Sequence, residues 1–113
     1  MNSIIEKAKA LYALEGYEYL QVPGHEGGRN DIRICRKDGE SRYVLRISAL
    51  EDRTEDDYLA EAEFIRYLAG HGAPVADVIP SVNGRLVECA EEKGKRVYIC
   101  LFEYACLNMP EAC

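Results

Sequence analysis

The stretch Tyr43-Val44-Leu45-Arg46-Ile47-Ser48 decides the fold, because it is an apolar strand with one charge at its centre. Side chains along a strand alternate between faces, so Val44, Arg46 and Ser48 share one face and the other three share the opposite one. A charge among apolar residues needs a partner or a ligand. Arg46 therefore predicts an ion pair or a bound anion, and the plain alternative is an edge position from which its guanidinium reaches water.

Downstream of this strand, the residues from 54 to about 69 predict a helix. Thr54 suits the N-cap position, and the acids that follow it suit the positive end of the helix dipole. Glu61 lies four residues before Ile65 and so falls on the apolar stripe of this helix. Because buried charges are costly unless paired, an inward-facing acid so close to an inward-facing base predicts an Arg46–Glu61 ion pair.

The flanking sequence predicts the remainder of an α+β fold. A helix over residues 2–15, with Gly16 as its C-cap, is expected to pack against a sheet. Short turns between apolar runs predict a five-stranded antiparallel sheet, with the long helix packed on one face and crossing between the third and fourth strands. The expected strands are 17–22, 32–36, 43–48, 85–90 and 95–104.

Composition limits the classes of function. With 113 residues the chain makes one domain, and its net charge of −6 argues against binding nucleic acid or anionic membranes. No apolar run reaches the roughly 20 residues that cross a bilayer. The start of the chain lacks the pattern of a secretion signal, so a cytoplasmic location is expected. Five cysteines, with no Cys-x-x-Cys pair, predict reduced thiols and no metal site, with Cys35 and Cys100 in the core.

The segment Gly24-His25-Glu26-Gly27-Gly28-Arg29-Asn30 predicts a glycine-rich turn between the first two strands. Glycines let the backbone approach a ligand without interference from Cβ atoms, and consecutive N–H groups can face phosphate oxygens. The alternative is an ordinary hairpin turn. The segment is not a Walker A loop, because no Gly-Lys-Ser/Thr follows.

In this order, the motifs resemble the small lobe of the aminoglycoside phosphotransferase and choline kinase family, a branch of the protein-kinase-like fold. The resemblance covers residues from about 17 to 105, so a kinase-like N-terminal lobe is expected over 1–105 and an atypical tail over 106–113. It rests on Gly27-Gly28-Arg29-Asn30, Tyr43-Val44-Leu45-Arg46, Glu61 with Phe64-Ile65-Arg66-Tyr67-Leu68, Gly72-Ala73-Pro74-Val75 and Leu101-Phe102-Glu103-Tyr104-Ala105.

The resemblance implies a nucleotide-binding role for particular residues. The glycine-rich turn would cover the ATP phosphates, Arg46 would contact ATP, and Glu61 would orient Arg46. Phe102 would border the adenine pocket, while the Glu103 carbonyl and the Ala105 N–H would hydrogen-bond adenine. The residues assigned to the nucleotide are Gly27, Gly28, Arg29, Asn30, Val44, Arg46, Glu61, Phe102, Glu103 and Ala105.

The resemblance also implies parts that these residues do not contain. The family's His-x-Asp-x-x-x-x-Asn loop and a later Asp supply the base and the Mg²⁺ ligands of phosphoryl transfer, and neither has a match here. The catalytic lobe is therefore expected to be absent, the chain to be inactive alone, and Mg²⁺ to bind only with that lobe. The tail lacks the Gly that the family has soon after the hinge, and a shifted reading frame, a truncated gene or deliberate shortening would each produce such a tail.

Two kinds of function follow. The first is the ATP-binding lobe of a phosphotransferase that moves the γ-phosphate of ATP to a hydroxyl of a small molecule, with aminoglycoside, choline and homoserine all open as acceptors. The second is a non-catalytic interaction module that keeps the fold. An unrelated small domain with a chance order of motifs is the third interpretation.

Association is the last expectation from sequence. The lobe is expected to bind nucleotide weakly and to form a homo-oligomer through residues 97–113, because a separated lobe would expose its hinge strand. The alternative is that the helix over 2–15, or the tail itself, covers this surface. The residues expected in the exposed patch are Ile99, Leu101, Leu107 and Met109.

Overall fold

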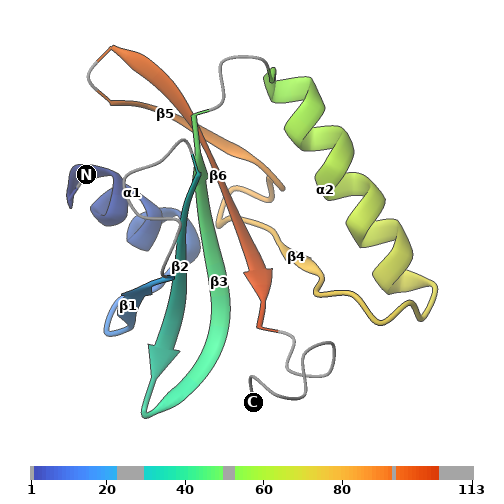
Figure 1. Ribbon diagram of the computed structural model, residues 1–113, viewed down its shortest axis with the longest axis horizontal. Helices are drawn as coiled ribbons and strands as arrows, with labels where there is room; N and C mark the ends of the chain where they lie inside the picture. The colour runs from blue at the N-terminus through green and yellow to red at the C-terminus, as the bar shows by residue number, and fades with distance from the viewer. Residues whose placement is uncertain (1, 23–29, 50–52, 93, 105–113) are drawn as a thin grey trace.

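One antiparallel sheet of six strands forms the centre of the computed structural model, which describes residues 2–22, 30–49, 53–92 and 94–104. The strands pair in the order β1-β2-β3-β6-β4, and β5 pairs with the remaining length of β6. The central neighbours β3 and β6 are therefore far apart in sequence (Figure 1). The strands are β1 (Glu18–Gln21), β2 (Asn30–Lys37), β3 (Glu40–Ser48), β4 (Val78–Ile79), β5 (Glu88–Glu92) and β6 (Lys95–Glu103).

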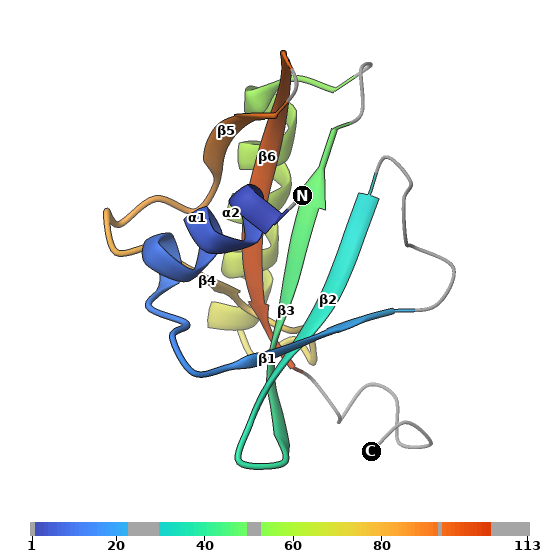
Figure 2. The same ribbon diagram turned by 90° about the vertical axis from the view of Figure 1, so that its left-hand side faces the viewer.

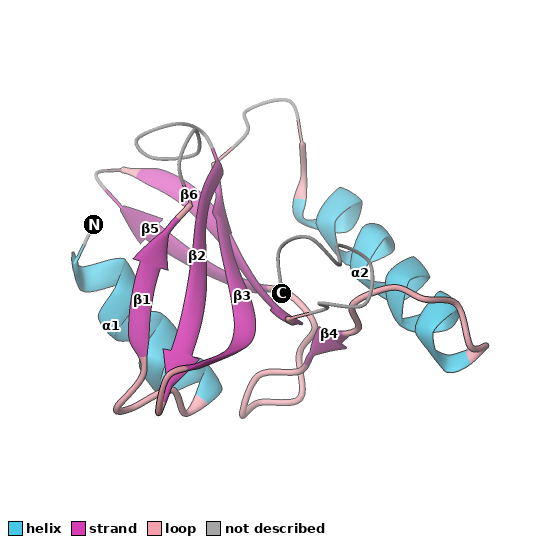
Figure 3. Cartoon of the chain, turned by 60° about the horizontal axis from the view of Figure 1, so that its bottom comes forward, coloured by secondary structure: helices cyan, strands magenta, loops and turns pink. Residues whose placement is uncertain are grey.

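Two helices cover opposite faces of this sheet (Figures 2 and 3). They are α1 (Asn2–Tyr12) and α2 (Glu55–Gly70), and α2 links β3 to β4. The predicted α+β architecture with a long helix on one face is confirmed. Strand β4 is an addition to the prediction, because two residues are too few for a period-2 pattern to be recognised. Within the described residues, no helix is long and apolar enough to cross a membrane.

Helix α1 covers the face of the sheet that carries Leu45 and Ile47. Its buried side chains pack on β3 and β6 to form the larger core, and the Tyr12 hydroxyl donates a hydrogen bond of 3.1 Å to the Ile99 carbonyl. The expectation of an exposed hinge strand is therefore wrong for Ile99 and Leu101, which are 0% and 1% exposed. The alternative, a cover formed by the N-terminal helix, is what the structure shows.

The remaining residues of that expected patch, Leu107 and Met109, lie outside the described residues. The predicted homo-oligomer therefore stays a prediction, and it loses the apolar surface on β6 that motivated it. Because α1 already covers the apolar face of β6, that face does not require a second copy of the chain to bury it.

Helix α2 packs on the opposite face through a second core cluster, centred on Tyr58. The Tyr58 ring stacks on Tyr98 with centroids 4.7 Å apart, and its hydroxyl lies 2.6 Å from Ser48 Oγ in a buried hydrogen bond. This side chain, 1% exposed, fixes the first turns of α2 against the end of β3. Cys35 and Cys100 are buried, as predicted, one in each core.

Local hydrogen bonds set the start of α2 and the end of α1. At the start of α2, Thr54 is the N-cap as predicted, and its exchange of hydrogen bonds with Asp57 forms a capping box. The predicted end of α1 is wrong: the helix stops at Tyr12, Ala13 adopts φ +54°, and the Leu14 N–H donates back to the Lys9 carbonyl at 3.0 Å. This early stop places Leu14 in the core at 1% exposure, and its burial compensates for the left-handed alanine.

Candidate functional site

Arg46 of β3 and Glu61 of α2 meet on the face of the sheet that α2 partly covers. Arg46 Nη2 lies 2.8 Å from Glu61 Oε1, and Nη1 lies 3.3 Å from Oε2. This two-pronged geometry is the strong form of an arginine–carboxylate pair. The predicted Arg46–Glu61 ion pair is confirmed, and the alternative of a guanidinium at a solvent edge is not, because the Arg46 side chain is only 17% exposed.

The surroundings of Arg46 hold its guanidinium in one orientation. The group lies 5.2 Å from the centre of the Phe102 ring and 5.7 Å from the centre of the Tyr58 ring. Its Nη2 is also 3.8 Å from the thiol sulfur of Cys100, the residue opposite Arg46 on β6. Aromatic faces attract a guanidinium, so these contacts add to the ion pair.

Electrostatics keep both partners charged. The hydrogen bond from Arg46 lowers the pKa of Glu61, with Arg53 adding to the effect. Burial is the largest influence on Arg46 and opposes its charge, but the hydrogen bond and charge of Glu61, together with the contact to Cys100, outweigh it, so the pKa of Arg46 is raised. Burial also raises the pKa of the Cys100 thiol, so this group is neutral at pH 7. The site thus presents a fixed cation without needing a change of protonation.

An apolar surface extends from Arg46 across the part of the sheet that α2 does not cover. Register places Ile32 opposite Arg46, Ile34 opposite Val44, and Leu20 opposite Ile34. These residues belong to neither core cluster, and Leu20 is 41% exposed while the others are half-buried. We call this surface the shelf; it consists of Leu20, Ile32, Ile34, Val44 and Phe102.

The shelf was only partly visible in the sequence. Val44 and Phe102 were predicted from their motifs, and β3 and β6 do bring them opposite one another. Leu20, Ile32 and Ile34 were missed, although the alternation around Ile32 and Ile34 was recognised as a strand. Assigning them to the face of Arg46 requires the register of the hairpin, which the sequence pattern alone does not give.

Backbone hydrogen bonds hold the hinge end of β6 in place. The Glu103 N–H donates to the Asp77 carbonyl at 2.9 Å, and the Tyr104 N–H donates to the Arg42 carbonyl at 3.0 Å. At the opposite end of the sheet, Asn30 begins β2 across from Ser48. The predicted site residues Gly27, Gly28, Arg29 and Ala105 lie outside the described residues.

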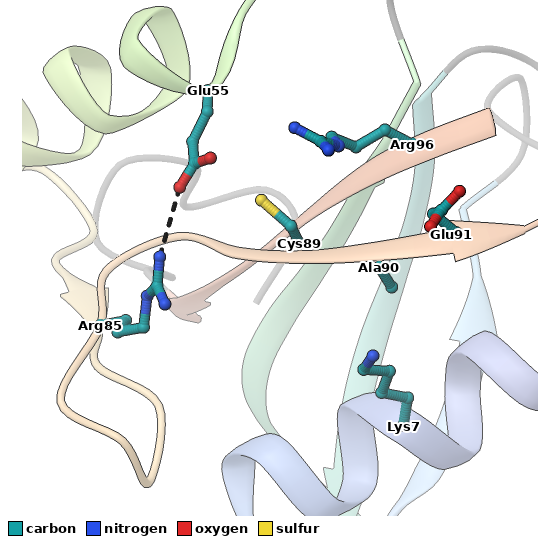
Figure 4. Close-up of a pocket in the computed structure, with 7 residues that line it drawn as sticks. All are labelled: Lys7, Glu55, Arg85, Cys89, Ala90, Glu91 and Arg96. Atoms are coloured by element: carbon teal, nitrogen blue, oxygen red, sulfur yellow. Dashed lines mark hydrogen bonds and ion pairs between the residues drawn. The ribbon is translucent and has the colours of Figure 1, made fainter.

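A hollow of about 380 Å³ lies elsewhere, between β5, α1 and the start of α2 (Figure 4). An ion pair of 3.3 Å between Arg85 and Glu55 spans one side of it, and Cys89 and Arg96 extend from the strands toward the same space. It shares no residue with the Arg46 site, and none of its residues was predicted to bind a ligand. Its lining is Lys7, Glu55, Arg85, Cys89, Ala90, Glu91 and Arg96.

Comparison with known proteins finds one family model and several relatives that match most of this chain. The model of the phosphotransferase enzyme family matches residues 22–105. Amicoumacin kinase of Bacillus subtilis (strain 168) is 33% identical over 91 residues, which are 80% of this chain and 26% of that kinase. The chain thus spans about a quarter of the length of this curated relative.

Solved structures agree with this match. An amicoumacin kinase in complex with AMP-PNP, Ca²⁺ and Ami shares 27% identity at a TM-score of 0.72, covering 92% of this chain and 30% of that one. The microcompartment-associated aminopropanol kinase has a TM-score of 0.75 at 15% identity, over 92% of this chain and 31% of the other. At that identity the second likeness shows the fold alone.

Proposed function

Because the chain belongs to the phosphotransferase enzyme family, we propose that it forms the lobe that binds ATP for transfer of phosphate to a small molecule. The observation that carries this proposal is the Arg46–Glu61 pair at the edge of the apolar shelf, which helix α2 leaves open. An apolar surface that ends at a fixed cation suits a ligand with an aromatic ring and an anionic tail. A nucleotide has both parts.

In this proposal the adenine lies on the shelf. Val44 and Phe102 contact the base, and the Glu103 carbonyl with the Ala105 N–H hydrogen-bonds its edge. The backbone of Gly27, Gly28, Arg29 and Asn30 covers the phosphates, and Arg46, oriented by Glu61, contacts them. Support comes from a relative of the same fold that was solved with the nucleotide analogue AMP-PNP.

The reaction of the whole enzyme would move the γ-phosphate of ATP to a hydroxyl of a small molecule. Two of the relatives are named amicoumacin kinase and aminopropanol kinase. Transfer requires a base near the acceptor and ligands for Mg²⁺, and the 113 residues hold no His-x-Asp-x-x-x-x-Asn pattern. We therefore propose that these residues bind nucleotide but do not transfer phosphate by themselves.

The test is a titration of the chain with ATP, followed by the methyl NMR signals of Ile32, Ile34 and Val44. We expect these signals to shift with a Kd of about 1 mM or weaker, which corresponds to no more than about 4 kcal/mol of binding free energy. Arg46→Ala should weaken binding, whereas Arg42→Ala, on the same strand but 41% exposed and paired with Glu40, should not.

Three results would count against the proposal. Shelf signals that do not shift at all at about 10 mM ATP, tenfold above a Kd of about 1 mM, would contradict the nucleotide site. Micromolar affinity would show that the site is more complete than proposed. ATP-dependent phosphorylation of a small alcohol by the pure chain would contradict the claim that these residues do not transfer phosphate.

A further inference from the structure

A second arginine, Arg53, contacts the same Glu61 carboxylate that Arg46 binds. Arg53 lies just before the N-cap of α2, and its Nη2 is 3.5 Å from Glu61 Oε1 and 3.3 Å from the Asp57 carbonyl. Its guanidinium also lies over the Tyr58 ring, 4.2 Å from the centre. Two guanidinium groups therefore converge on one carboxylate, and the cluster carries one positive charge in excess.

Tyr58 gives Arg53 a fixed platform. The phenol is buried, its hydroxyl is bonded to Ser48, and its ring is stacked on Tyr98. A guanidinium over such a ring gains a cation–π contact as well as a defined position. Arg53 is thus held in place although it precedes the helix.

The hydrogen-bond donors of the two arginines are used differently. Arg46 directs both terminal nitrogens at Glu61. Toward the described residues, Arg53 donates only from Nη2, so its Nε and Nη1 make no bond to that part of the chain. A guanidinium has five N–H donors and pairs well with phosphate oxygens. Arg53 is also more exposed than Arg46, at 29% against 17%. Of the two cations, Arg53 has more donors to offer an anion.

The strand register gives the direction in which these donors are offered. Asn30 starts β2 opposite Ser48, so the start of β2, Ser48 and its partner Tyr58 lie at one end of the sheet. Arg46 lies opposite Ile32, two residues further along. A ligand that rests its base on the shelf and extends past Arg46 toward this end arrives at Arg53.

We infer that Arg53 is a second phosphate-binding residue of the nucleotide site, contacting the phosphates through Nε and Nη1 while Arg46 remains held by Glu61. This inference rests on the proposed function, because it takes the shelf as the place of the base. It adds a phosphate contact from the residue that precedes α2 to the contact proposed for Arg46.

The experiment compares ATP, adenosine and inorganic tripolyphosphate as ligands in NMR titrations of four chains. The variants are Arg53→Ala, Arg53→Gln and, as control, Arg96→Ala, an exposed arginine beside the hollow of Figure 4. We expect both Arg53 variants to bind ATP about fivefold to tenfold more weakly, since a charge-assisted hydrogen bond is lost, and to bind adenosine unchanged. Glutamine keeps a polar side chain beside Tyr58, so it serves if the alanine variant does not fold.

The outcomes separate this inference from the proposed function. ATP binding that Arg53 variants leave unchanged overturns the inference and leaves the function standing. Equal losses for ATP and adenosine, or an equal ATP loss in Arg96→Ala, show a structural or bulk-charge effect and also overturn it. Tripolyphosphate binding that depends on Arg53, without ATP-induced shifts on the shelf, leaves Arg53 as an anion-binding residue but overturns both the nucleotide site and the inference that Arg53 belongs to it. No binding of any ligand overturns both.

Discussion

At the scale of single residues, Glu61 is the side chain on which the site depends, since it accepts hydrogen bonds from Arg46 and Arg53. We expect Glu61→Ala to lower the free energy of unfolding by about 1–2 kcal/mol, because it leaves Arg46 largely buried without its anion. The loss stays small because Glu61 is 34% exposed and water screens the pair. Urea unfolding measures it.

The matched control is Glu63→Ala, an exposed acid two residues along the same helix. It should change the stability by less than about 0.5 kcal/mol. If the two variants are equally stable, the Arg46–Glu61 pair contributes nothing to the fold.

The pH dependence of stability offers a second residue-scale prediction. Hydrogen bonds from arginine lower the pKa of Glu61 in the folded chain, whereas in the unfolded chain it is about 4.3. The unfolded state therefore takes up a proton first, and the stabilisation from Glu61 is complete above that pH and lost as pH falls through the lower, folded pKa. We expect the stability difference between the wild type and Glu61→Gln to shrink as pH is lowered from about 5 toward 3. A difference that grows over this range would reverse the sign of the linkage.

The same scale shows why one pair could be predicted from sequence and another contact could not. Arg46 and Glu61 lie in a strand and a helix, whose periods of 2 and 3.6 each define an inward face. Arg53 lies between such elements, where no period applies. Its position depends on Tyr58, whose tie to Ser48 only the packing of α2 on β3 reveals.

At the scale of elements, the end of α1 carries measurable strain. Ala13 adopts φ +54°, which costs a residue with a Cβ atom about 1–2 kcal/mol. Ala13→Gly should therefore stabilise the chain, by about 0.5–1 kcal/mol after allowance for the greater freedom of glycine when unfolded. Thermal or urea unfolding decides the sign.

Ala10→Gly is the control for that substitution. Ala10 is exposed in the interior of α1, where glycine costs about 1 kcal/mol. If Ala10→Gly lowers the stability and Ala13→Gly raises it, the helix ends between residues 10 and 13. Destabilisation by both would mean that the helix continues through residue 13.

The element boundaries show where local pattern stops being informative. The apolar spacing through Leu14 favoured a helix to residue 15, but burial of Leu14 is obtained by ending the helix early. The start of α2 was predicted correctly because its capping box is a local device, formed between Thr54 and Asp57.

At the scale of the whole molecule, α1 closes the face of the sheet that would otherwise be apolar and open. The Tyr12 hydroxyl, bonded to the Ile99 carbonyl, is the polar link in that contact. Tyr12→Phe should lower the stability by about 1 kcal/mol, since the hydrogen bond is lost and a buried carbonyl loses a partner. Tyr67→Phe, at a site 59% exposed, is the control and should be neutral. Equal effects would show that the link is without consequence.

The exposed hinge strand was the one expectation at this scale that the structure overturned. The sequence predicted a helix over the first residues and a sheet after it, which is enough for the fold class. Which face the helix covers depends on contacts between residues almost the whole chain apart, such as Tyr12 and Ile99. No local pattern contains that pairing.

That same contact has a consequence for the timing of folding during synthesis. Tyr12 and its partner Ile99 are 87 residues apart, so α1 leaves the ribosome long before the strand that it covers exists. At about 5–20 residues per second, the helix waits roughly 4–17 s with its apolar stripe open to water. Strand β6, which pairs with β3 at the centre of the sheet, is also the last strand to be synthesised. A chaperone that binds short apolar helices would therefore have its opportunity early in translation, and would have to release α1 once β6 has emerged.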